Sequence, residues 1–178
     1  TRDGLVLLVF GLGIEQFIKK RFWFSFGLFF TSTAWFIFLN NFAYPALNGD
    51  KGTVMALSRY QAYGSNFSEI ILNILIRPNL LISNIDWEGS LFYLFILFLP
   101  VLFFLRRISF QTLAVSLPLL VTNILSDSSA QRDLVHQYSL PISLIIIISL
   151  INGFQNNNHY FRYYFRLFWI LLCWSALA

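Results

Sequence analysis

Phe22–Phe42 reads FWFSFGLFFTSTAWFIFLNNF and contains no charged side chain. A helix needs roughly 20 apolar residues to cross the hydrocarbon core of a bilayer, and this stretch is long enough. The hydroxyls of its Thr-Ser-Thr run at 31–33 can bond to carbonyls of the preceding turn, so they tolerate burial in lipid. Trp23 and Tyr44 lie near its ends, where interfacial aromatic residues are common. The stretch therefore predicts a membrane-spanning helix.

The composition of the whole chain also indicates lipid as the solvent. Hydrophobic residues make up 57%, aromatic residues 19% and charged residues 11%, with a mean hydropathy of +0.67. A soluble domain has about 25% charged residues, so a soluble fold could not cover this much apolar surface. The net charge of +4 does not indicate a nucleic-acid partner, because in a membrane protein basic residues are interpreted by their position.

Further apolar runs on both sides of Phe22–Phe42 predict an all-α fold. We expect one polytopic transmembrane domain over residues 1–178, with about six spanning helices and a short interfacial helix. The predicted spans are 4–18, 22–42, 87–105, 108–125, 138–154 and 165–178, and the predicted external loops are 43–86 and 126–137. The sequence starts at Thr1 and ends within an apolar run, so we expect it to be part of a larger membrane protein.

Polar residues inside the apolar runs predict where helices face one another. Thr112, Ser116 and Asn123 recur at helical spacing, and in lipid their shared face should turn toward other helices. Glu15 is the one acid within an apolar run. It could be a functional intramembrane carboxylate, but Lys19 four residues later favours an ordinary ion pair.

The short helix is predicted inside the first external loop. Asn66 followed by Glu69 is typical of a helix start, and Pro78 should end the helix near Ile76. About ten apolar residues are too few to span a bilayer, so this helix should lie in the interface or between other helices.

The distribution of basic residues predicts the orientation. With alternating spans, seven basic residues fall on the side of Lys19-Lys20-Arg21, whereas the opposite loops hold four, Lys51, Arg59, Arg77 and Arg132. Such a bias marks the cytoplasmic face. Both polar loops should therefore lie outside the cytoplasm.

Candidate site residues lie in these two loops. They are Arg59, Tyr60, Arg77, Asp127, Arg132, His136 and Tyr138. Arginine presents a fork of donors that matches phosphate oxygens, so the arginines could bind the phosphate of a lipid carrier. Asp127, Asp133 or His136 could position or deprotonate an acceptor. The alternative is that these are solvated interfacial charges. No metal site is expected, because His-x-x-His and Glu-x-x-His spacings are absent and Cys173 is the single cysteine.

Several short motifs in these loops, and in the apolar runs between them, follow one another in an order that is typical of a known protein family. They are Arg59-Tyr60, Gly64-Ser65, Glu69-Ile70, Arg77-Pro78, Leu99-Pro100, Leu117-Pro118-Leu119-Leu120, Asn123 to Ser126 and Gln137 to Pro141. In this order the sequence resembles the bacterial membrane-protein family called domain of unknown function 2079. That family is similar in layout to multispanning glycosyltransferases that use polyprenyl-phosphate sugars. The resemblance implies a bacterial inner, or thylakoid-type, membrane.

Two functions follow as hypotheses. The resemblance implies the C-terminal part of a glycosyltransferase acting on the non-cytoplasmic side, with a lipid-phosphate-linked donor and no other cofactor. In that superfamily the catalytic acid lies in an external loop near the N-terminus, which we expect upstream of Thr1. The alternative is a non-catalytic subunit or scaffold that packs against other membrane subunits. A transporter is the weakest hypothesis, because only Glu15 is a candidate buried ionisable group.

Overall fold

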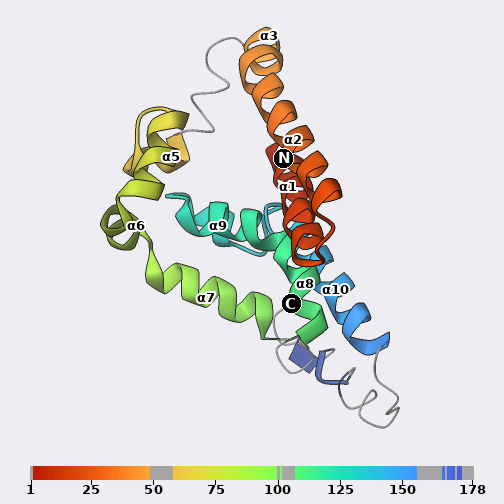
Figure 1. The fold of residues 1–178 in the computed structure, drawn as a ribbon. Helices are drawn as coiled ribbons and strands as arrows, with labels where there is room; N and C mark the ends of the chain where they lie inside the picture. Colours follow the sequence, from red (N-terminus) through yellow and green to blue (C-terminus); the bar gives the residue numbers. More distant parts are fainter. Residues whose placement is uncertain are drawn as a thin grey trace.

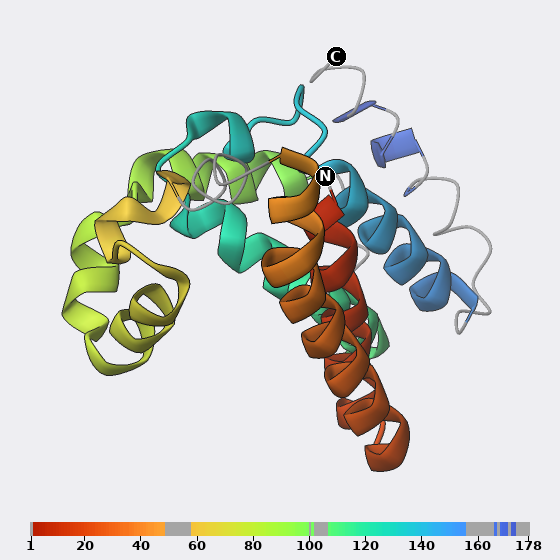
Figure 2. The ribbon, with the colours of Figure 1, turned by 90° about the horizontal axis from the view of Figure 1, so that it is seen from above.

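The computed structural model describes residues 2–48, 58–99, 101, 107–155, 166, 168–170 and 172–173. Every regular element in these ranges is helical, which confirms the all-α prediction. The elements are α1 Arg2–Ile18, α2 Phe22–Phe38, η1 Leu39–Ala43, α3 Tyr44–Asn48, η2 Ser58–Tyr63, α5 Phe67–Ile76, α6 Pro78–Asn84, α7 Trp87–Phe98, α8 Arg107–Leu113, η4 Ala114–Ser116, α9 Leu117–Leu125, η5 Ser129–Arg132 and α10 Leu140–Gln155. In Figures 1 and 2, α5 and α6 form one end and α10 lies toward the other, with α7 and α9 between them.

The first two helices form an antiparallel pair (Figure 1). The rings of Phe10 and Phe29 lie 4.7 Å apart between them. The buried Ser25 hydroxyl donates to the carbonyl of Gly13 at 2.8 Å. Lipid provides no hydrophobic drive for helix association, so close packing and an interhelical hydrogen bond of this kind are expected to hold the pair together.

A glycine lets α1 approach η4 closely. A Cβ atom added at Gly11 would lie 2.0 Å from the carbonyl oxygen of Val115. Real Cβ atoms never come this close to backbone, so a larger residue would force the two elements apart. Gly11 therefore fixes how α1 sits on the middle of the 107–125 segment.

The helix that begins at Phe22 is longer than predicted. It continues through the π-helical turn η1 and through α3, so Phe22–Leu47 forms 26 residues of helix. The prediction that the helix ends at Phe42 is therefore wrong, and the external position of the residues that follow stays a prediction. The helix contains Pro45, although a proline ring inside a regular α-helix collides with the carbonyl four residues earlier. The π-turn, in which the amide of Tyr44 donates to the carbonyl of Leu39, changes that spacing just before the proline.

The described residues contain fewer clear membrane spans than the six predicted. Among the described residues, Phe22–Leu47 is long and apolar enough to cross a membrane, and α6 with α7 would pass together if their 78° bend is one broken span. Gly4–Ile18, Ser109–Leu125 and Leu140–Gly153 are shorter apolar helices. The predicted span 165–178 and the end of 87–105 lie mostly outside the described residues. Six spans remain a prediction.

The short helix α5 begins and ends where the sequence indicates. The side chain of Asn66 accepts a hydrogen bond from the amide of Glu69 at 2.8 Å. The Glu69 carboxylate in turn accepts from the amide and the hydroxyl of Ser65, and these bonds, the amide first, lower its pKa. The helix ends at Ile76, before Pro78. The capping prediction is confirmed.

The predicted helix 108–125 contains a 3₁₀ turn, η4, just before Pro118. Thr112, Ser116 and Asn123 are all buried, so the predicted inward face is confirmed. The next helix, α10, begins at Leu140 and not at Tyr138.

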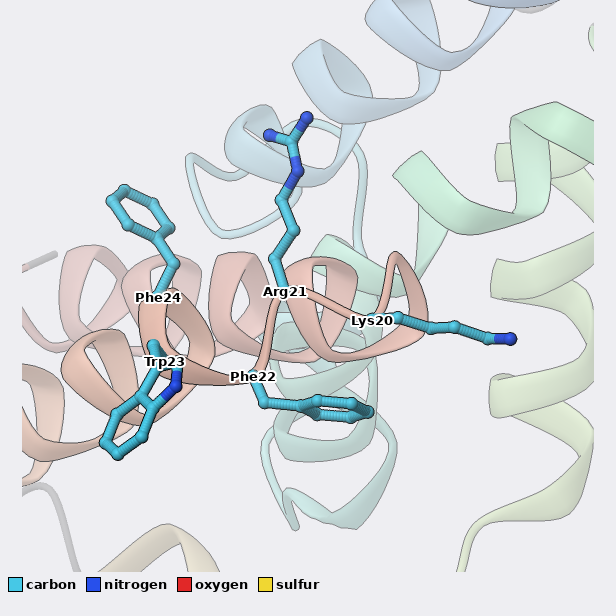
Figure 3. A pocket seen from close by; sticks show the side chains of 5 residues that line it. All are labelled: Lys20, Arg21, Phe22, Trp23 and Phe24. Atoms are coloured by element: carbon cyan, nitrogen blue, oxygen red, sulfur yellow. The ribbon is translucent and has the colours of Figure 1, made fainter.

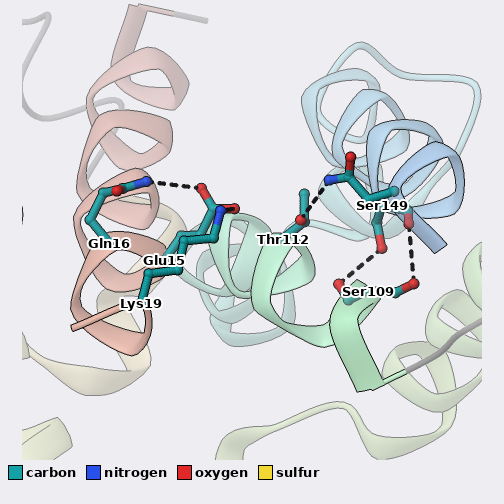
Figure 4. Close-up of polar contacts among 7 residues, drawn as sticks. Glu15, Gln16, Lys19, Ser109, Thr112 and Ser149 are labelled. Carbon is teal, nitrogen blue, oxygen red and sulfur yellow. Dashed lines mark hydrogen bonds and ion pairs between the residues drawn. The ribbon is translucent and has the colours of Figure 1, made fainter. Parts of the chain in front are cut away.

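Helices α8 and α10 are joined by a reciprocal pair of hydrogen bonds. The Ser109 hydroxyl donates to the carbonyl of Ser149 at 3.1 Å, and the Ser149 hydroxyl donates to the carbonyl of Ser109 at 3.0 Å (Figure 4). One turn away, Asn152 donates to the hydroxyl of Thr112 at 3.0 Å. Hydroxyls and amides bound in this way can lie between apolar helices without leaving polar atoms unpaired.

The predicted pair on α1 is also present. Lys19 Nζ lies 2.8 Å from Glu15 Oε1, and Gln16 Nε2 lies 3.5 Å from the other oxygen (Figure 4). Glu15 is buried, and the ammonium group of Lys19 compensates the charge of its carboxylate. The ion pair with Lys19 is therefore sufficient to explain why a carboxylate lies within this apolar helix.

Candidate functional site

Two polar segments that are far apart in the sequence meet in the structure. We call this contact, between η2 and residues 126–139, the loop junction. The amide of Asp127 donates to the carbonyl of Arg59 at 2.8 Å. The Tyr60 hydroxyl lies 3.2 Å from the carbonyl oxygen of Thr122 and 3.4 Å from Gln131 Oε1. The two loops in which the candidate residues were predicted therefore form one surface.

Arg59 lies at the centre of the loop junction. It is half-buried, and one of its terminal nitrogens donates to the Tyr138 hydroxyl at 3.0 Å. Its guanidinium carbon lies 5.2 Å from the centroid of the Tyr138 ring. No carboxylate in the described part of the chain forms an ion pair with it. Its remaining N–H groups can therefore donate hydrogen bonds to an anionic ligand.

Arg132 has a different environment. Its side chain is 7% exposed, and it donates to the carbonyl of Ser126 and, at 2.8 Å, to Asp86 Oδ2. Asp86 also accepts from the amide of Gly89 at 3.0 Å, which caps α7. The pKa of Asp86 is lowered, mainly by the bond from Gly89 and further by Arg132. Arg132 thus ties the second loop to the start of α7.

Tyr63 is a member of the junction that the sequence did not reveal. It is 1% exposed, and its hydroxyl has no hydrogen-bond partner among the described residues. Its pKa is raised, first by burial and then by the charge of Asp127, while Arg132 opposes the shift. Tyr63 therefore stays a neutral donor at physiological pH. Asp86 and Gln131 were missed as well. Tyr63 follows Tyr60 closely in sequence, but nothing in that spacing indicates an unpaired hydroxyl.

Beneath the junction, a buried polar cluster holds the base of the second loop. The Tyr93 hydroxyl lies 3.1 Å from Asn123 Nδ2 and 3.2 Å from the hydroxyl of Ser139. All three residues are buried. They belong to α7, α9 and the residue just before α10, so the position of neighbouring Tyr138 is set by three elements.

Two of the predicted residues are not part of this arrangement. Arg77 is exposed at the end of α5. His136 is exposed and contacts Asp133, with 3.3 Å between Nδ1 and the carboxylate. Arg59, Tyr60, Asp127, Arg132 and Tyr138 are brought together. No group of three or more His, Cys, Asp and Glu side chains that could hold a metal occurs within the described ranges.

A family model described as a predicted membrane protein matches residues 1–178. This chain belongs to the DUF2079 family. Comparison with curated proteins and with solved structures gives no match. Membership of DUF2079 confirms the resemblance inferred from the loop motifs and agrees with the apolar composition. The similarity in layout to lipid-linked glycosyltransferases is not addressed by this match.

Proposed function

We propose that this DUF2079 chain is an integral membrane segment whose loop junction binds the phosphate of a lipid-linked carrier on the non-cytoplasmic side. The bound carrier would be the donor of a glycosyltransferase. One observation carries the proposal: Arg59 is half-buried, positioned by Tyr138, and has no ion-pair partner among the described residues. A partly desolvated guanidinium in this state favours an oxyanion ligand.

The neighbours of Arg59 suit the same ligand. The Tyr63 hydroxyl is a neutral buried donor, and leaving such a group unpaired costs about 1–3 kcal/mol. This hydroxyl is closed off from the surface, so a ligand would reach it only after the junction shifts. Asp127 is exposed beside them and would position the hydroxyl of an acceptor. Arg132 would keep the loop in place through Asp86 and Ser126.

The orientation is supported by two independent features. The basic clusters around Lys20 and Arg107 fall on one side in the alternating arrangement. The two loops of the opposite side contact each other through Arg59 and Asp127, as expected for segments that leave the bilayer on the same face. The six-span arrangement would use the shorter apolar helices as further spans, and α1, with 17 residues, is at the lower limit for crossing.

The binding test uses the full-length protein in nanodiscs and compares polyprenyl phosphate with polyprenol, which lacks the phosphate. We expect the phosphate form alone to bind tightly. Arg59→Gln should weaken binding about tenfold or more, because it removes a charge-assisted contact. Arg77→Gln removes an exposed arginine away from the junction and should leave the affinity unchanged. Equal binding of polyprenol, or full affinity in Arg59→Gln, contradicts the proposal.

Cysteine labelling tests the orientation. In a Cys173→Ser background, Gln61→Cys and Ser129→Cys place thiols at exposed positions on the two loops, and Lys20→Cys places one at the opposite turn. A membrane-impermeant reagent added outside the cytoplasm should label positions 61 and 129 but not position 20. Labelling of only one of the two loop positions would contradict a shared non-cytoplasmic face.

A scaffold role is the second candidate, because α2 has a large uncovered apolar surface. Only 17% of the residues in the most apolar stretch of Phe22–Leu47, which includes α2, are buried within the protein, and Phe30 and Trp35 are exposed. Lipid or another subunit must cover this face. If another subunit covers it, Phe30→Ala with Trp35→Ala should release a co-purifying membrane protein, whereas Arg59→Gln should retain it.

A further inference from the structure

The turn between α1 and α2 is built from basic and aromatic residues. Three backbone hydrogen bonds close the end of α1, the last from the amide of Arg21 to the carbonyl of Gln16 at 2.9 Å. Lys20 has a positive φ of 61°, which reverses the chain within this short turn. The side chains of residues 20–24 consequently fan out from the turn (Figure 3).

The position of this turn places it at a membrane surface. Phe22 is the first residue of the 26-residue helix Phe22–Leu47, which is the longest apolar helix among the described residues. If this helix crosses the bilayer, the residues just before it lie among the headgroups. Trp23 is 93% exposed and Phe24 is also exposed, as expected for aromatic rings that contact the headgroup and upper acyl region.

The charges of the turn are not neutralised by the protein. Lys19 pairs with Glu15, but neither Lys20 nor Arg21 has an ion-pair partner in the described part of the chain. Both are exposed and line an open hollow of about 430 Å³ together with Phe22, Trp23 and Phe24 (Figure 3). The two basic side chains leave the turn in different directions, with the aromatic rings on either side (Figure 3), so the turn offers separate cationic contacts and apolar surface to lipids with an anionic head and a hydrocarbon body.

We propose that the hollow at Lys20–Phe24 is a binding site for anionic phospholipid. Lys20 and Arg21 each contact the phosphate groups of neighbouring lipids, and the rings of Phe22, Trp23 and Phe24 contact the glycerol and upper acyl chains. The site is separate from the loop junction and does not depend on the function proposed there. Its role is to anchor the α1–α2 turn and hold the depth of α2 in the bilayer.

The test reconstitutes the full-length protein in nanodiscs that contain phosphatidylcholine and phosphatidylglycerol, and counts the lipids retained by native mass spectrometry. We expect the wild type to enrich phosphatidylglycerol. Lys20→Gln and Arg21→Gln should each lower that enrichment about fivefold, since one basic residue near a surface contributes about that factor in anionic lipid binding. Arg77→Gln, at an exposed position away from this turn, is the matched control and should retain the enrichment.

A second measurement uses only wild-type protein and Trp23→Leu, so it remains informative if a charge variant fails to fold. Brominated phosphatidylglycerol should quench a component of tryptophan fluorescence that is absent in Trp23→Leu, and high salt should reduce the quenching. Brominated phosphatidylcholine should quench that component less. Equal quenching by both lipids, or undiminished enrichment in both charge variants, would overturn the proposal.

Discussion

At the contact of α1 with η4, the backbone of Gly11 lies directly against Val115, whereas at the loop junction η2 meets residues 126–139 through polar side chains and backbone groups. The first contact depends on the absence of a side chain, and the second on particular donors and acceptors. In hydrocarbon, helices gain from close approach because lipid already solvates their apolar surfaces. Near the headgroups, water competes for every hydrogen bond, so several weak bonds must act together. A single substitution at the first contact should therefore cause a large loss of stability. A single substitution at the second contact should cause a smaller loss, because the other hydrogen bonds remain.

The largest effect is expected at Gly11. Gly11→Ala places a methyl group against the Val115 carbonyl and should destabilise the fold by about 3 kcal/mol, the upper part of the usual range for overpacking. Gly27→Ala is the control, because a Cβ atom there meets nothing within 4 Å. It should be neutral or slightly stabilising. Thermal unfolding of the full-length protein in detergent measures both, and equal melting temperatures would contradict the close contact.

A smaller loss is expected at Arg132. Arg132→Gln removes the bonds to Ser126 and Asp86 and should cost about 2 kcal/mol. It should also increase hydrogen exchange in residues 126–139 while leaving α1 unchanged. Arg77→Gln, which changes an exposed arginine, should stay within about 0.5 kcal/mol. Unchanged exchange in Arg132→Gln would show that the loop is held by other contacts.

The cap of α5 should contribute about 1 kcal/mol. Asn66→Ala removes the acceptor of the Glu69 amide, so α5 should exchange its first amides faster. Ser68→Ala changes an exposed residue on the same turn and serves as the control. If both variants exchange alike, the Asn66 side chain does not cap the helix in the membrane-bound protein.

The smallest effect is a pH dependence at Asp86. Its pKa is lowered in the folded chain, so its contribution to stability is present above the ordinary pKa of 3.8 and is lost as the pH falls through the lowered value. The melting temperature of the wild type should therefore fall between pH 5 and pH 3 more steeply than that of Asp86→Asn. Glu69 titrates in the same direction in both proteins and cancels in this comparison. Parallel slopes would contradict the assignment.

Sequence patterns predicted those features that depend on neighbouring residues. The cap at Asn66, the pair Glu15–Lys19 and the inward face of Thr112, Ser116 and Asn123 all follow from local spacing. The prediction that the helix ends at Phe42 was wrong, because a π-turn accommodates Pro45 and no local sequence pattern indicates such a turn.

The site was only partly predictable. The sequence indicated two polar loops with arginines, and the structure shows that Arg59 and Arg132 differ. Arg132 forms an ion pair with Asp86, which is 46 residues away in the sequence. Arg59 donates a hydrogen bond to Tyr138, which is 79 residues away. Such partners depend on the tertiary arrangement, so no local pattern could separate the two arginines or reveal the unpaired hydroxyl of Tyr63.

The reciprocal bonds between Ser109 and Ser149 also restrict how the protein can move. Sliding α10 along α8 by one helical turn, about 5.4 Å, would break both bonds at once and separate Asn152 from Thr112. The two helices should therefore travel as a single rigid unit. Any rearrangement that opens or closes the loop junction must then bend the chain elsewhere, and residues 133–139, which join the 3₁₀ turn η5 to α10, are the nearest non-helical link among the described residues.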